Sequence, residues 1–121
     1  MKSFKRTDRV GSLIRDALSK LFLFEVQDPR VKLAVITQVK VTPDFSLARV
    51  YVRSLQGSDA QGRQELLLGL GKCKGFLRSA LGKKIDLLRI PVLEFFFDET
   101  PDEAARIEVM LAQLRVDKPG E

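Results

Sequence analysis

The residues best suited to chemistry are the basic side chains between positions 63 and 90. That segment holds seven basic and two acidic residues, whereas residues 91–121 hold three basic and eight acidic ones. Lysine and arginine at this density can neutralise phosphate groups, which favours contact with a polyanion such as a nucleic acid. A solvated lysine-rich face explains the same run equally well when only this segment is considered. The side chains concerned are Lys72, Lys74, Arg78, Lys83, Lys84 and Arg89.

Three glycines, Gly69, Gly71 and Gly75, interrupt a leucine pattern that is typical of a helix. Their spacing does not match a nucleotide-binding glycine loop, so we interpret them as a break between two helices. A helix that restarts near Gly75 would present unpaired backbone amides, with Lys74 and Arg78 on one face just past the break. The region around Gly75 is therefore a predicted phosphate contact.

A second basic cluster lies at the N-terminus, before and in the first turn of the first predicted helix. It consists of Lys2, Lys5, Arg6 and Arg9. Cations at a helix N-terminus oppose the helix dipole, which favours a binding role for this cluster over a stabilising one. Aromatic residues are few, with one tyrosine, no tryptophan and eight phenylalanines that mostly follow apolar patterns. We therefore expect recognition of RNA through its backbone and shape, and not through stacking of single-stranded bases.

Enzyme chemistry is disfavoured by the residues that are missing. The 121 residues include no histidine, which removes the usual catalytic base and a common metal ligand. The single cysteine, Cys73, lies in the leucine pattern without a neighbouring base, and we interpret it as a packed thiol. The acidic residues between 98 and 103 flank a predicted helix start, where carboxylates cap free amides. We expect no catalytic residue, metal or cofactor, and the lack of a signal or membrane-spanning segment indicates the cytoplasm.

The first half of the chain predicts one helix and a hairpin. Apolar residues at helical spacing predict a helix from Val10 that stops before Asp28 and Pro29. Two β-branched runs, residues 35–42 and 47–53, predict antiparallel strands with one wetter face. In the first of these strands, positions 35, 37, 39 and 41 are expected to share a face.

The second half predicts two helices over residues 66–81 joined by a kink, and then a mostly buried strand from Pro91. Thr100 is the expected cap of a terminal amphipathic helix, with Pro101 at its first position. This order predicts a small α+β sandwich. We expect one domain over residues 1–121, in which 100–121 form the C-terminal helix and tail.

Several short motifs occur in a specific order along the chain. They are Arg9-Val10, Asp28-Pro29-Arg30, Thr37, Asp44 before Ala48-x-Val50-Tyr51-Val52, Gly75-Phe76-Leu77-Arg78, Pro91-x-Leu93-x-Phe95, Asp98 and Arg106-Ile107-Glu108. In this order they resemble the ribosome-binding factor A family from about Arg9 to Leu111. The sequence departs from the family pattern at Cys73, where alanine is usual, and at Leu88, where arginine is usual.

The resemblance implies a type II KH-like fold, ordered helix-strand-strand-helix-kink-helix-strand, with a C-terminal helix. In this family a kinked Ala-x-Gly replaces the G-x-x-G of other KH domains, and here the kink is Cys73-Lys74-Gly75. The resemblance also implies a non-enzymatic assembly factor that binds the free small (30S) ribosomal subunit. Such a factor assists late maturation, including 16S rRNA processing, and is associated with growth in the cold.

We therefore expect the small ribosomal subunit and 16S rRNA as partners of a monomeric protein that does not bind membranes. The predicted rRNA contacts are Lys5, Arg6, Arg9, Lys72, Lys74, Gly75, Arg78, Lys83 and Lys84. Charge reversal at Lys74 and Arg78 is expected to weaken binding and leave thermal stability unchanged. The alternatives are a generic KH-like RNA chaperone, or a protein-interaction module that uses the acidic C-terminal helix.

Overall fold

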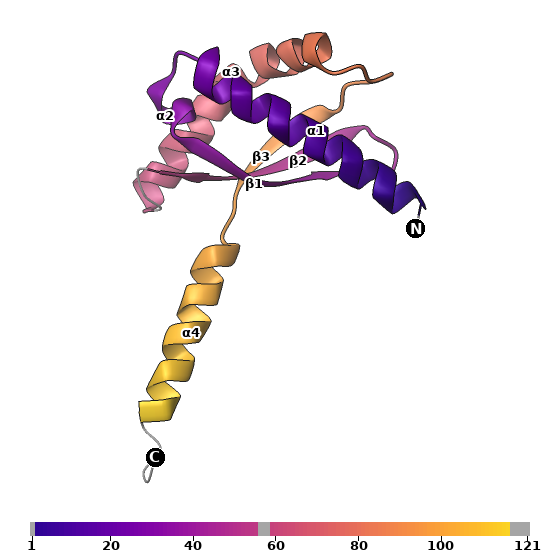
Figure 1. The fold of residues 1–121 in the computed structure, drawn as a ribbon. Helices are drawn as coiled ribbons and strands as arrows, with labels where there is room; N and C mark the ends of the chain where they lie inside the picture. Colours follow the sequence, from indigo (N-terminus) through magenta and orange to yellow (C-terminus); the bar gives the residue numbers. More distant parts are fainter. Residues whose placement is uncertain (1, 56–58, 117–121) are drawn as a thin grey trace.

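A three-stranded sheet with helices on one face forms the body of the protein (Figure 1). The computed structural model describes residues 2–55 and 59–116. Its elements are α1 (Lys2–Phe24), α2 (Pro29–Lys32), β1 (Ala34–Val41), β2 (Leu47–Ser54), α3 (Ala60–Lys84), β3 (Val92–Phe97) and α4 (Thr100–Val116). Figure 1 shows α1 and α3 on the same side of the sheet, while α4 projects away from the other side. No helix in the described part of the chain is long and apolar enough to cross a membrane.

The sheet order β1-β2-β3 places β2 in the centre. Strand β2 pairs antiparallel with β1 and parallel with β3, and α3 supplies the long connection that a parallel pair needs. Every second residue of β2 faces the helices, so Ala48, Val50 and Val52 are fully buried. They join the leucine faces of α1 and α3 in one core, which confirms the predicted α+β layers and hairpin.

The sequence predicted that the first helix begins at Val10, but the helix begins at Lys2. Apolar periodicity marks only the part of a helix that packs on the core, and the polar turns before Val10 carry no such signal. The helix does end before Asp28, as expected. The single turn of α2 was missed, although its cap is readable: Asp28 Oδ1 accepts a 2.9 Å hydrogen bond from the Arg30 amide, and Pro29 opens the turn.

Strand β1 contains a bulge that the sequence pattern did not reveal. Ile36 pairs with Val52 and Gln38 pairs with Tyr51, so Thr37 is an extra residue on β1. The bulge reverses the alternation, and the expected common face of positions 35, 37, 39 and 41 is wrong. Ile36 is buried and Val39 packs on the core, whereas Val35 is 41% exposed.

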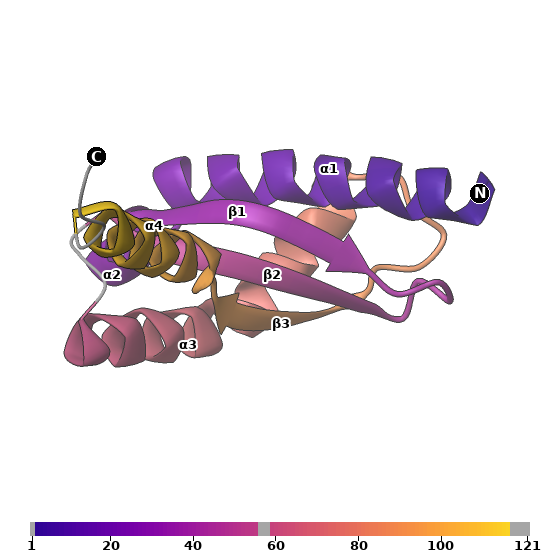
Figure 2. The ribbon, with the colours of Figure 1, turned by 90° about the horizontal axis from the view of Figure 1, so that it is seen from below.

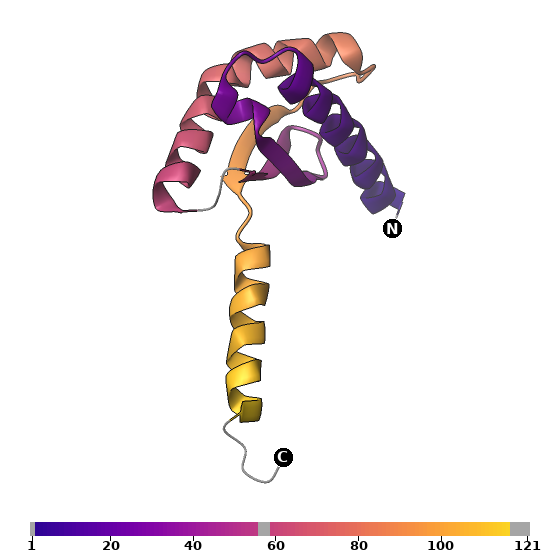
Figure 3. The same ribbon diagram turned by 60° about the vertical axis from the view of Figure 1, so that its left-hand side comes forward.

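The basic segment forms one helix, α3, and not two. Its axis nevertheless bends along its length, as Figure 3 shows. Because Gly75 lies inside this continuous helix, the predicted free helix N-terminus at that point is wrong. That Cys73, Lys74 and Gly75 form the bend remains a prediction.

The third strand starts at Val92, one residue after the predicted start near Pro91, and it is not mostly buried. It is an edge strand, so Leu93 faces the core while Val92 and Phe96 are exposed on the opposite face. The terminal helix also differs at its start. Thr100 is already helical, and Asp98 Oδ1 accepts a 2.9 Å hydrogen bond from its amide, so the carboxylate of Asp98 does the work expected of the Thr100 hydroxyl.

Candidate nucleic-acid interface

Helix α3 carries basic side chains that the sequence predicted for rRNA binding. Lys72, Arg78, Lys83 and Lys84 are exposed, whereas Lys74 is partly buried at the flank of the helix. The expected face shared by Lys74 and Arg78 therefore turns partly toward the body of the domain. Exposed cations at four positions along one helix can attract phosphate groups.

A hollow of about 430 Å³ lies against α3, and Arg78 is its only basic lining residue among the described ones; the others are Gly75, Ser79, Gly82 and Ile90. Gly75 has no heavy atom within 4 Å of the position that a Cβ would occupy. A nucleic-acid backbone can therefore approach the helix closely at this point. Gly75 does not open a helix, but it leaves the helix surface accessible at this point, and its contact with rRNA stays a prediction.

Arg78 has a structural task besides any contact with RNA. Its Nη2 donates a 2.9 Å hydrogen bond to the Ile90 carbonyl and its Nε donates a 3.3 Å bond to the Pro91 carbonyl. Arg78 thus holds the segment that leads into β3 against α3. The expectation that charge reversal at Arg78 leaves thermal stability unchanged does not fit these hydrogen bonds.

Gly69 serves packing, unlike Gly71 and Gly75, which face open space. A Cβ at Gly69 would lie 3.2 Å from Arg30 Nε and 3.3 Å from Asp28 Oδ2. Arg30 forms a 2.7 Å ion pair with Asp28 and donates its Nε to the same carboxylate, which holds the pKa of Asp28 below its usual value. This pair stiffens the start of α2, and the missing side chain at Gly69 lets α2 lie close to α3.

Cys73 packs against the core as a partly buried thiol, which confirms its interpretation from sequence. Burial raises its pKa, so the neutral thiol is favoured over the nucleophilic thiolate. Asp98 and Glu99 are likewise occupied, because Asp98 binds Thr37 and Thr100 while Glu99 forms a 2.6 Å ion pair with Arg63. Among the described residues, no group of acidic and cysteine side chains could hold a metal ion.

The N-terminal cluster is not continuous with the basic face of α3. Lys83 and Lys84 lie beside Glu25, just past the end of α1, in a hollow of about 370 Å³. Arg9 precedes Glu25 by 16 residues, or about 24 Å along the helix and its end. Arg6 and Arg9 are exposed, and the side chain of Lys5 lies outside the described part of the structure. The structure thus describes two separate basic regions, one at each end of α1.

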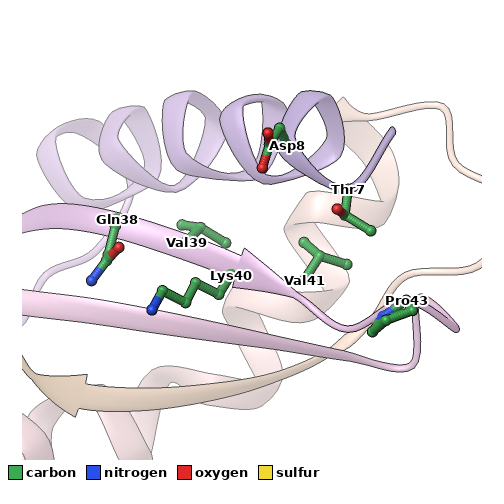
Figure 4. Close-up of a pocket in the computed structure, with 7 residues that line it drawn as sticks. All are labelled: Thr7, Asp8, Gln38, Val39, Lys40, Val41 and Pro43. Atoms are coloured by element: carbon green, nitrogen blue, oxygen red, sulfur yellow. The ribbon is translucent and has the colours of Figure 1, made fainter. Parts of the chain in front are cut away.

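A further hollow of about 570 Å³ lies between the first turns of α1 and the end of β1 (Figure 4). Thr7 and Asp8 line it from the helix, and Gln38, Val39, Lys40 and Val41 line it from the strand. Asp8 contributes one negative charge to this hollow and Lys40 contributes one positive charge, so the lining carries no excess of positive charge. This hollow therefore suits a phosphate group less well than the face of α3 does.

The sequence did not reveal an aromatic pair on the open face of the sheet. The rings of Tyr51 and Phe96 stack with centroids 5.6 Å apart, and Lys40 Nζ lies 5.5 Å from the Tyr51 centroid. Alternation along β2 correctly placed Tyr51 on the wetter face. Its contact with Phe96 depends on the parallel register of β2 and β3, which no local pattern indicates.

The comparisons with known proteins agree with this architecture. The family model described as ribosome-binding factor A matches residues 6–111. The chain is 36% identical to ribosome-binding factor A of Aromatoleum aromaticum, over 93% of this chain and 87% of the relative. It is 41% identical to that of Alcanivorax borkumensis, over 96% and 84%. The crystal structure of ribosome-binding factor A from Thermus thermophilus superposes with a TM-score of 0.65 at 25% identity, covering 75% of this chain and 93% of that one. The fold is accordingly KH-like, and the chain belongs to the ribosome-binding factor A family.

Proposed function

We propose that this protein is a cytoplasmic, non-catalytic assembly factor that binds the free small (30S) ribosomal subunit. Family membership supports ribosome binding, and the exposed cations of α3 together with the accessible surface at Gly75 support contact with rRNA phosphates. The proposed role extends to late maturation, including 16S rRNA processing, and to growth in the cold. The exposure of Lys72, Arg78, Lys83 and Lys84 on α3 is the single observation that carries the proposed mode of binding.

The proposed mechanism divides the task among the residues of α3. Gly75 faces open space, so an RNA backbone can lie against the helix at this point. The exposed side chains of Lys72, Lys83 and Lys84 supply positive charge elsewhere along the same helix. Arg6 and Arg9 then contact a second RNA segment, because they lie too far along α1 to serve the same phosphates.

Sedimentation of the purified protein with isolated small subunits, large subunits and joined ribosomes at two salt concentrations tests the proposal. We expect selective, salt-sensitive association with free small subunits. The variant Lys83→Glu with Lys84→Glu should weaken it and reduce its salt dependence. Lys20→Glu with Arg106→Glu is the matched control, because it makes the same charge change at exposed positions outside the proposed site.

Equal association with every ribosomal particle would contradict the preference for small subunits and favour a generic RNA chaperone. Equal effects of the two double variants would show that only net charge matters, which would contradict the proposed site on α3. The proposed role in maturation is tested in cells that carry the Lys83→Glu, Lys84→Glu protein. These cells should accumulate precursor 16S rRNA and grow poorly in the cold.

A second role is favoured by the exposure of α4. Its apolar side chains Ile107, Met110, Leu111 and Leu114 are each about half exposed, and α4 projects away from the sheet (Figure 1). Such a surface suits a protein partner. Deletion of residues 100–121 should then abolish capture of that partner and leave RNA binding intact.

A further inference from the structure

The face of the sheet opposite α1 and α3 is open. Figure 2 views the domain from this side and shows the strands with α1 and α3 beyond or beside them, and with α4 projecting toward the viewer at one end of the sheet. By register, the side chains of Gln38, Tyr51 and Phe96 form one row across the three strands, and those of Lys40, Arg49 and Glu94 form the next. An aromatic row therefore lies beside a row that contains two cations.

The aromatic row offers flat surface to the solvent. Tyr51 and Phe96 stack with an interplanar angle of 29°, and Phe96 is 37% exposed although it is a large apolar side chain. Phe96 points away from the core because its neighbours Phe95 and Phe97 pack toward it. A stacked pair of rings fixed on a sheet provides a preorganised surface for another planar group.

The charges around the rings indicate what kind of planar group fits. Lys40 lies against the Tyr51 ring, and Arg49 is exposed in the adjacent row without a hydrogen bond or ion pair to another described residue. Glu94 is the acidic neighbour of Arg49 across the strands. Two cations and one carboxylate leave a positive balance, which favours a ligand that combines aromatic rings with negative charge.

We propose that this face, defined by Lys40, Arg49, Tyr51 and Phe96, binds unpaired bases of single-stranded RNA. Bases stack on exposed aromatic rings of sheets, while neighbouring cations contact the phosphates between them. The inference goes beyond the proposed function, on which it rests for the presence of RNA. It assigns backbone contact to α3 and base contact to the sheet, so that the two sites take different forms of RNA.

Tyrosine fluorescence gives a direct test, because Tyr51 is the only tyrosine and the chain has no tryptophan. A ten-nucleotide oligouridylate should quench Tyr51 emission in a saturable manner, since a stacked base quenches the ring. An RNA duplex of similar length should bind through α3 and leave the emission unchanged. Phe96→Leu should weaken binding of the single strand about tenfold, as expected for loss of one stacking ring, and should leave duplex binding unchanged.

Phe24→Leu is the matched control, because Phe24 is another exposed phenylalanine that lies at the end of α1. This variant should bind both RNAs like the wild type. The quenching experiment uses the unaltered protein, so it decides the question even where Phe96→Leu lowers stability. Absence of quenching by the single strand, or equal quenching by the duplex, would overturn the inference.

The two proposals fail in different ways. Selective sedimentation with small subunits but no quenching by single-stranded RNA would overturn only the base-binding face. Quenching without any preference for small subunits would overturn the proposed function and retain that face. A change in Tyr51 emission with isolated small-subunit proteins, but not with RNA, would assign the face to a protein and overturn the inference.

Discussion

The hydroxyl of Thr37 donates a 2.5 Å hydrogen bond to Asp98 Oδ2, and this bond joins the bulge in β1 to the residue that follows β3. Asp98 is only 7% exposed, and its other carboxylate oxygen accepts the amide of Thr100 at the start of α4. Arg53 Nη1 donates to the Asp98 carbonyl at 2.6 Å. Asp98 is therefore the point at which the two edge strands and the last helix are tied together.

Replacement of Thr37 by valine should lower the free energy of unfolding by about 1–3 kcal/mol, because the Asp98 carboxylate loses a donor while it stays buried. Urea denaturation measures this change. Thr37→Ser keeps the hydroxyl and is the control that should remain close to the wild type. A valine variant as stable as the wild type would contradict this role.

The same pair predicts a dependence on pH. The hydrogen bond from Thr37 holds the pKa of Asp98 below its ordinary value of 3.8. Because the pKa of Asp98 is lower in the folded state, the ionised carboxylate stabilises the folded protein above pH 3.8. This contribution is lost as the pH falls through the lowered pKa. The stability difference between wild type and Thr37→Val should therefore be complete at neutral pH and shrink in acid.

Gly11 permits a close approach between α1 and strand β1. A Cβ at this position would lie 2.9 Å from the Val39 carbonyl oxygen, and backbone cannot move away as a side chain can. Gly11→Ala should therefore destabilise the protein by about 1–3 kcal/mol, the usual cost of overpacking. Gly71→Ala meets open space and should stabilise by up to about 1 kcal/mol. Thermal unfolding of the two variants should thus give shifts of opposite sign.

Arg78→Ala should lower stability by about 1 kcal/mol, because the Ile90 and Pro91 carbonyls lose their charged donor. Lys74→Ala should not lower stability, because the Lys74 ammonium makes no comparable hydrogen bond to the described residues. Denaturant titration of both variants separates these effects. Equal stability of Arg78→Ala and Lys74→Ala would show that Arg78 is free to act on RNA alone.

Asp44 organises the turn between β1 and β2. It accepts the Ser46 hydroxyl at 2.7 Å, the Ser46 amide at 3.0 Å and the Thr42 hydroxyl at 2.8 Å, which lower its pKa from 3.8 to about 2. The ionised carboxylate therefore stabilises the turn above pH 3.8, and this contribution disappears as the pH falls through about 2. An NMR titration of the Asp44 carboxyl carbon should show the low midpoint, and Asp44→Ala should lose stability at neutral pH but not in strong acid.

Much of this protein follows from local sequence patterns. The helical periodicity after Val10, the β-branched runs of β1 and β2 and the basic composition of α3 each concern neighbouring residues, so sequence alone predicted the element order, the hairpin and the candidate cations. The ordered motifs predicted the family and its fold. These features depend on the preferences of short segments and on the order of the segments along the chain.

Tertiary structure decided the features that join distant segments. The bulge at Thr37 reverses the faces of β1, the carbonyls of Ile90 and Pro91 engage Arg78, and the parallel register brings Phe96 beside Tyr51. The length of α1 separates the basic regions at its two ends. None of these relations is encoded in local periodicity, because each arises from how whole elements pack to bury their apolar faces.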